Sequence, residues 1–97
     1  MALSMPETES GAPVVARFDT ESDVLYISLG EPVESYSEEQ PKGLLFRKAY
    51  ASDKPSGVTA IDFRAHWRGK VGVLSTLVAD YLGVPKSAVK AEIKRVT

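Results

Sequence analysis

Three acidic side chains at alternate positions form the densest group of potential ligands in the sequence. Asp19, Glu21 and Asp23 all fall within residues 19–23. Carboxylate oxygens are ligands that Ca²⁺ and Mg²⁺ prefer, so a small-ligand or metal-binding enzyme built on this turn is our first alternative function. The stretch lacks the glycine and the distal glutamate of an EF-hand loop. Because Asp and Ser side chains also bond to the backbone of tight turns, we favour a solvated hairpin turn.

The single histidine, His66, is a candidate general base because imidazole titrates near neutral pH. Catalysis would also need a nucleophile or a second acid–base group beside it. Asp62 lies four residues earlier, which is about 13 Å away along a strand. The sequence contains no G-x-S-x-G, phosphate-loop or H-E-x-x-H motif. We therefore predict a protein that is not an enzyme and needs no cofactor.

A second group of residues combines positive charge with an aromatic ring. It consists of Arg64, Trp67, Arg68 and Lys70. Arginine and tryptophan are enriched at the energetically dominant positions of protein–protein interfaces. Aromatic rings beside arginines also hold single-stranded nucleic acids. A third interpretation is that Trp67 closes a small core while the arginines are solvated.

The charges are distributed unevenly along the chain. Residues 1–63 carry five basic and eleven acidic side chains, whereas residues 64–97 carry seven basic and two acidic ones. Such asymmetry occurs in proteins that bind nucleic acid, and binding by the basic segment 64–97 is our second alternative function. The basic residues are dispersed, however, and the net charge is −1, so we expect no nucleic-acid partner. The two halves would instead attract each other, within one chain or between protomers.

Short strands must position these side chains. Alternating apolar and β-branched residues predict strands over 14–18, 24–29, 33–38, 44–50 and 58–63. The connections are short and rich in Gly, Pro, Asp and Ser, which indicates an antiparallel β-meander of four to five strands. The acidic segment 33–38 is typical of an edge strand, because its charges discourage pairing with another sheet.

Helical spacing replaces this alternation after residue 70. Apolar residues at three- and four-residue intervals predict a helix over 71–82 that ends at Gly83. Pro85 suits the first position of a second helix. A strand over 88–96 is also compatible with the pattern, although a helix over 85–96 is favoured. We expect the helix over 71–82 to cover the sheet face that carries Leu25, Ile27 and Leu29, which gives an α+β fold.

The opposite face of the sheet is the predicted interface. We expect Tyr26, Tyr36 and Tyr50 to share it, because an exposed aromatic face favours a partner. With such a small core, self-association is the simplest way to bury this face, so a homo-oligomer is expected, with a further protein partner as an additional option. The predicted interface residues are Tyr26, Tyr36, Arg47, Tyr50, Trp67 and Arg68.

Length and composition limit the remaining options. Ninety-seven residues, 43% of them hydrophobic and 26% charged, are typical of one globular domain, here 14–97. The polar residues 1–13 are expected to be a flexible segment without the features of a signal peptide. No apolar run approaches the roughly 20 residues of a membrane span. Cysteine is absent, so we expect no disulfide and a cytoplasmic location.

Residues 18–27 resemble the opening signature of a family known as domain of unknown function 2283. That signature is an aromatic residue, then Asp, Glu and Asp at alternate positions, then an apolar–Leu–Tyr–Ile strand, and the sequence here is FDTESDVLYI. The glycine-led segments 43–46 and 57–63 are similar to later parts of the family pattern. The stretch 47–56 departs from it, since the family has an acidic turn where this chain is basic and aromatic.

The resemblance covers residues 14–66, and the basic extension 67–97 lies outside it. It implies a small, sheet-based prokaryotic protein of the cytosol with no established activity. Some members of that family are thought to be encoded beside toxin-like partners. The resemblance therefore also implies a binding role, such as the antitoxin-like half of a two-protein regulatory system.

Overall fold

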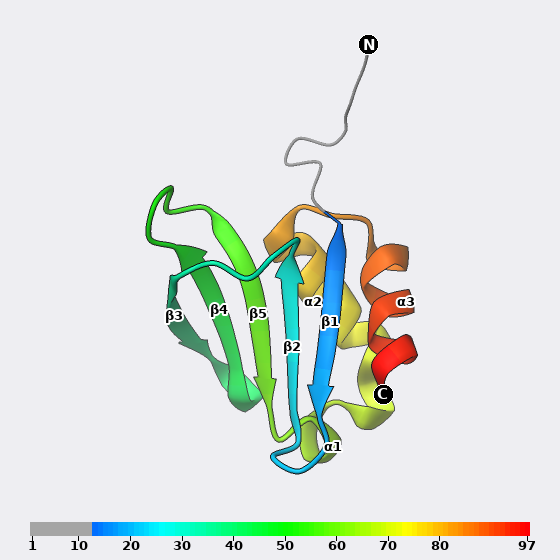
Figure 1. Ribbon diagram of the computed structural model, residues 1–97. Helices are drawn as coiled ribbons and strands as arrows, with labels where there is room; N and C mark the ends of the chain where they lie inside the picture. The colour runs from blue at the N-terminus through cyan, green and yellow to red at the C-terminus, as the bar shows by residue number, and fades with distance from the viewer. Residues whose placement is uncertain (1–12) are drawn as a thin grey trace.

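The computed structural model describes residues 13–97 as a sheet covered on one side by helices (Figure 1). The strands are β1 (Val14–Asp19), β2 (Val24–Leu29), β3 (Ser35–Gln40), β4 (Leu44–Ala49) and β5 (Pro55–Ile61). The helical elements are α1 (Phe63–His66), α2 (Val71–Leu82), α3 (Lys86–Val96) and the short 3-10 turns η2 (Pro41–Gly43) and η3 (Arg68–Lys70). The predicted α+β class is confirmed. The expected flexible segment 1–13 lies, apart from Pro13, outside the described residues.

The strands do not follow chain order across the sheet. The order is β1-β2-β5-β4-β3 with every neighbouring pair antiparallel, so the simple connectivity of a meander needs correction. Strand β5 lies at the centre, and four of its consecutive residues, 57–60, are therefore buried although consecutive residues point to opposite faces. The acidic strand β3 lies at an edge, as predicted. The segment 30–34 therefore crosses in front of β5 to join β2 to β3 (Figure 1).

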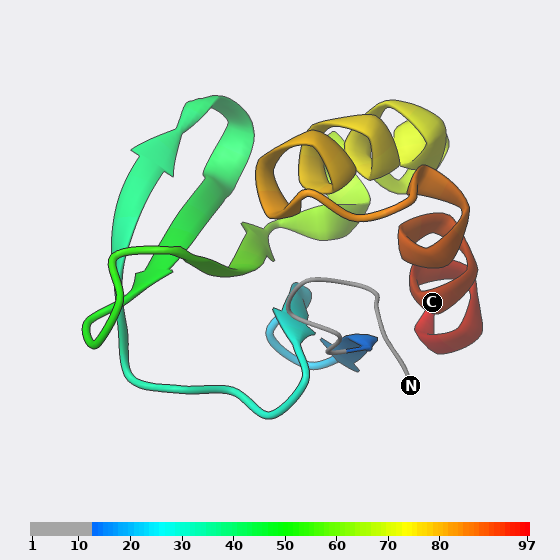
Figure 2. The same cartoon turned by 90° about the horizontal axis from the view of Figure 1, so that it is seen from above.

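The core lies between the sheet and the helices α2 and α3, which share one side of it (Figure 2). Helix α2 packs on β5 and α3 packs on β1. The face predicted to be covered is covered: Leu25 and Ile27 are buried on it and Leu29 is half-buried. Helix α3 shares this role with the helix over 71–82. The core residues are Ala16, Leu25, Ile27, Leu44, Val58, Ala60, Phe63, Trp67, Leu74, Val78, Ala79, Leu82, Val89 and Ile93.

The two long helices begin and end close to the predicted positions. Gly83 follows α2 with φ 72°, the left-handed conformation that glycine adopts without strain. Pro85 is the N-cap of α3, one position earlier than expected. Residues 86–96 form a helix rather than a strand, because Val89 and Ile93, four residues apart, are both fully buried on one side of it. Within residues 13–97 no helix is long and apolar enough to cross a membrane.

Helix α1 replaces the end of a predicted strand. The strand over 58–63 ends at Ile61, and Asp62 turns the chain with φ 56°. Asp23, at the start of β2, anchors the new direction: its carbonyl oxygen accepts from the Phe63 N–H and its carboxylate accepts from the Arg64 N–H. The turn before β2 thus fixes the position of α1, although about 40 residues separate them in sequence.

Helix α3 also closes one edge of the sheet. The Ala16 N–H of β1 donates to Glu92 Oε1 at 3.0 Å, and the Ala16 carbonyl oxygen accepts from Arg95 Nη2 at 3.0 Å. Glu92 and Arg95 are themselves paired at 2.9 Å. These two side chains therefore satisfy backbone groups that a further strand would otherwise pair with.

Candidate functional site

The acidic turn is held by its own hydrogen bonds. Asp19 Oδ1 accepts from the backbone N–H groups of Glu21 and Ser22 at 3.1 and 3.3 Å. The bonds to Ser22, followed by that to Glu21, hold the pKa of Asp19 below its usual value. Asp23 is turned away toward α1. Over residues 13–97 no three carboxylate or imidazole groups come together to hold a metal, so the turn does not assemble the ligand set of the metal-binding alternative.

His66 lies closer to Asp62 than a strand would place it. The expected separation of about 13 Å is wrong, because residues 63–66 are helical and the His66 N–H donates to the Asp62 carbonyl oxygen at 3.1 Å. The side chain of His66 is half-buried at the end of α1. No hydrogen bond or ion pair joins it to Asp62 or to another described side chain, so it has no orienting partner of the kind that a general base uses.

The three tyrosines do not share one face. Tyr36 pairs in register with Lys48 and lies on the helix side of the sheet, with the Tyr50 ring 5.4 Å away. The Tyr36 hydroxyl donates to Asp53 Oδ1 at 2.7 Å, and this bond raises the pKa of Tyr36 to about 12. Tyr26 points to the other face. The prediction failed because β5 lies between β2 and β4, so alternation within each strand did not reveal their relative register.

Trp67 belongs to the core. It is 4% exposed, and its indole N–H donates to the Lys42 carbonyl oxygen at 3.2 Å. Trp67 is therefore a core residue, as in the interpretation that it closes a small core, and little of its side chain is exposed for a partner to contact. Arg47 is half-buried on the face that carries Tyr26, and its carbonyl oxygen accepts from the Tyr81 hydroxyl at 2.9 Å. Arg68 is exposed on η3.

The sheet face opposite the helices, which we call the open face, carries an ordered row of side chains. All described helices lie on the other side of the sheet (Figure 2). The row crosses five strands in register and contains Arg17, Tyr26, Thr59, Leu45 and Glu39. It spans about 19 Å at the usual strand spacing. Tyr26, the buried Thr59 and Leu45 thus occupy its middle, with a cation at one end and an anion at the other.

A second short row extends the apolar middle of the open face. Val24 pairs with Ile61 beside the first row. Ile61 is 38% exposed and Tyr26 is 37% exposed. The guanidinium of Arg17 lies 5.9 Å from the centre of the Tyr26 ring, a cation–π distance that holds both side chains over the sheet. Tyr26 and Arg47 are the predicted interface residues that this face brings together.

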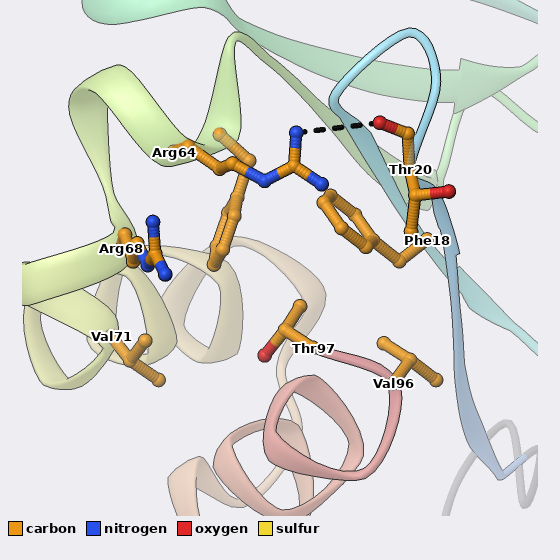
Figure 3. A pocket seen from close by; sticks show the side chains of 8 residues that line it. Phe18, Thr20, Arg64, Arg68, Val71, Val96 and Thr97 are labelled. Carbon is orange, nitrogen blue, oxygen red and sulfur yellow. Dashed lines mark hydrogen bonds between the residues drawn. The ribbon is translucent and has the colours of Figure 1, made fainter.

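A basic pocket opens between β1, the α1–η3 segment and the end of α3 (Figure 3). Its volume is about 280 Å³, and its lining residues are Phe18, Thr20, Phe63, Arg64, Arg68, Val71, Val96 and Thr97. The Arg64 guanidinium lies 5.3 Å from the centre of the Phe18 ring and donates to the Thr20 carbonyl oxygen at 3.3 Å. The two arginines of the predicted basic–aromatic cluster therefore share this pocket, with phenylalanines in place of Trp67.

A larger hollow of about 670 Å³ lies at the other end of the sheet. The segment 30–34 and the residues around the β4–β5 loop line it, and it includes Tyr50, which is 66% exposed, and Val33, which is 52% exposed. Leu29 and Pro55 add further apolar surface, and the rest of its wall is formed by small or polar side chains. Tyr50 lines this hollow and Tyr26 does not, so these two residues of the predicted interface face different surroundings.

Sequence reasoning missed most of the pocket wall. The sequence assigned Phe18 and Phe63 to strands and Val96 to the second helix, and it gave Thr97 no role. These residues meet because α3 returns to β1, and no local motif marks such a contact. The available signal was the pair Arg64 and Arg68, four residues apart, which indicated a basic surface but not its aromatic wall.

Comparisons with known proteins add no assignment. No family model matches the chain, and neither a curated protein nor a solved structure matches it. The resemblance of residues 14–66 to domain of unknown function 2283 therefore stays a prediction.

Proposed function

We propose that the protein is a non-enzymatic interaction module whose open face docks against a second copy of the chain. The observation that carries this proposal is the exposure of Tyr26 and Ile61, 37% and 38%, on a sheet face that none of the described helices covers. Each Å² of apolar surface removed from water contributes about 25 cal/mol. A domain this small buries little apolar surface on its own and gains most from such a contact.

The charges at the ends of the row favour a second copy as the occupant. Arg17 lies at one end and Glu39 at the other, with uncharged side chains between them. Consider two copies whose open faces meet across a two-fold axis parallel to the strands. In the partner, the row then runs in the opposite direction across the strands. Arg17 of each protomer then faces Glu39 of the other, so the same surface complements itself. A two-fold axis across the strands would instead oppose like charges.

This arrangement stacks two sheets face to face with their strands aligned, as in β-sandwiches. The aromatic and aliphatic side chains of Tyr26, Val24 and Ile61 would form the centre of the contact. Arg47 would lie beside them and face the β2 side of the other protomer. Rotation about this axis leaves the direction of the strands unchanged. The segments 30–34 of the two protomers would therefore lie at the same end of the contact.

Sedimentation velocity of matched variants tests the proposal. Ile61→Glu places a carboxylate in the centre of the open face, and Leu77→Glu places one on α2 at nearly the same exposure, 38% against 39%. We expect the wild type to dimerise, and Ile61→Glu to weaken the dimer at least about tenfold, because a charge must then be buried without a partner. Leu77→Glu should leave the dimer unchanged.

Thermal unfolding of both variants shows whether each is folded. A monomeric wild type at high concentration contradicts the proposal, and so does equal weakening by the two substitutions. Native mass spectrometry of protein purified from its own host extends the test. A stoichiometric complex with a different protein, formed in place of the homodimer, would favour the binding half of a two-protein system and overturn the self-association proposed here.

A further inference from the structure

We infer that the basic pocket binds a small organic oxyanion, with a phosphate or carboxylate group at the arginines and an apolar body against the phenylalanines. None of the eight lining side chains is acidic, and Arg64 and Arg68 both carry a positive charge. The carboxylate of Asp23 lies 3.8 Å from Arg64. Arg64 already has Asp23 as an acidic neighbour, so the charge of Arg68 is the one that an anion in the pocket would compensate. The pocket is separate from the open face and from the self-association proposed for it.

Arg64 is held in place before any ligand arrives. Its guanidinium lies over the Phe18 ring, donates to the Thr20 carbonyl oxygen and lies 3.8 Å from Asp23 Oδ1. A guanidinium has five N–H donors in a rigid fork, so these contacts leave donors for an oxyanion. Figure 3 shows it at one side of the pocket, pointing toward Phe18 and Thr20. An arginine ordered in this way loses little conformational entropy on binding.

Arg68 lacks a counter-charge. Among residues 13–97 no carboxylate lies within 4.0 Å of its guanidinium, whereas Arg64 and Arg95 each have an acidic neighbour at or within that distance. Its side chain is exposed and lies near Val71, whereas the Arg64 guanidinium reaches toward Phe18 and Thr20 (Figure 3). It can therefore supply charge-assisted hydrogen bonds to an incoming anion, which are about twice as strong as neutral ones.

The remaining walls favour an anion with an apolar body. The rings of Phe18 and Phe63 meet edge to face with their centres 5.5 Å apart, and Val71 and Val96 add aliphatic surface. Thr20 and Thr97 complete the lining. A volume of about 280 Å³ is near the lower limit of small-molecule sites. The pocket thus has room for an aromatic ring with one anionic group rather than for a long polymer.

Titrations with four probes, followed by nuclear magnetic resonance of the backbone amides, test this inference. Phenyl phosphate and benzoate combine a ring with an anion, whereas inorganic phosphate lacks the ring and phenol lacks the anion. We expect saturable shifts at Phe18, Arg64 and Thr97 with one of the two organic anions. That anion should bind roughly tenfold tighter than inorganic phosphate or phenol. Whichever organic anion binds more tightly identifies the head group as phosphate or carboxylate.

Arg68→Gln and Lys70→Gln form a matched pair for the same titrations. Both side chains are exposed on η3 and both changes remove one positive charge, but only Arg68 lines the pocket. Arg68→Gln should weaken binding roughly tenfold, and Lys70→Gln less than about twofold. The inference is overturned if no probe gives saturable shifts at millimolar concentration, or if both substitutions weaken binding equally, as expected for unspecific attraction.

Discussion

At position 57 the backbones of β2 and β5 approach so closely that only glycine fits. A Cβ atom on Gly57 would lie 2.5 Å from the Ile27 carbonyl oxygen. The neighbour is backbone in a paired strand, so a side-chain rotation cannot relieve the contact. The close approach matters for the proposed interface, because β2 and β5 together present Tyr26 and Ile61 on the open face.

Gly57→Ala should therefore lower the free energy of unfolding by about 1–3 kcal/mol, because the two strands must separate to admit the methyl group. Gly72→Ala is the control, since nothing lies within 4 Å of a Cβ atom added there in α2. It should raise the free energy of unfolding by up to about 1 kcal/mol through helix propensity. Urea unfolding measures both. Equal effects of the two substitutions would contradict the close contact at position 57.

At single residues of the site, the residue type alone left two interpretations open. The composition of the acidic turn allowed Asp19 to bind a metal or to bond to the turn, and the structure shows bonds to Glu21 and Ser22. Trp67 allowed an interface or a core, and its bond to Lys42 shows the core. In the case of Trp67 the deciding partner lies 25 residues away. A residue type indicates which bonds are available, but distant partners decide which of them form.

Among the elements, α3 has a role beyond covering the core. Glu92 and Arg95 bond to the backbone of Ala16 and so protect the β1 edge of the sheet. The Arg95 side chain, followed by the Ala16 N–H, lowers the pKa of Glu92. The ionised form of Glu92 therefore stabilises the fold. That contribution is complete above the unfolded-state pKa and is lost as the pH falls through the lower folded-state pKa.

Glu92→Gln should lower the free energy of unfolding at neutral pH, and its difference from wild type should shrink as the pH falls below about 4. Lys94→Gln is the control, because Lys94 is exposed on the same helix and has no ion pair within the described chain. Urea unfolding across this pH range measures the difference. A difference between Glu92→Gln and wild type that stays constant with pH would show that the carboxylate does not stabilise the edge.

Element type could be predicted from the sequence, but element order could not. The strand over 24–29 and the helix over 71–82 were predicted to the residue, since their apolar spacing has the period of the structure they form. The position of β5 between β2 and β4 depends on pairings between distant segments. Helix α1 was missed for a similar reason, because Asp23 determines where it begins.

For the whole molecule, the arrangement of the layers creates both candidate sites. The helices cover one face of the sheet and leave the open face to a partner (Figure 2). The return of α3 to β1 brings Thr97 beside Phe18 and forms the basic pocket. The sequence predicted an interaction surface and a basic cluster, but it placed Tyr26, Arg47 and Arg68 together in one interface. Tyr26 and Arg47 lie on the open face, whereas Arg68 lies at the pocket.

The most direct test of the proposed dimer reverses the charges at the ends of the row. Arg17→Glu and Glu39→Arg, each alone, oppose like charges across a two-fold axis parallel to the strands, and the double variant restores opposite charges. Sedimentation equilibrium gives the dissociation constants of the four proteins. We predict that each single variant weakens the dimer roughly fivefold and that the double variant returns to within about twofold of wild type. A double variant as weak as the two single effects combined would contradict the pairing of Arg17 with Glu39 of a second copy.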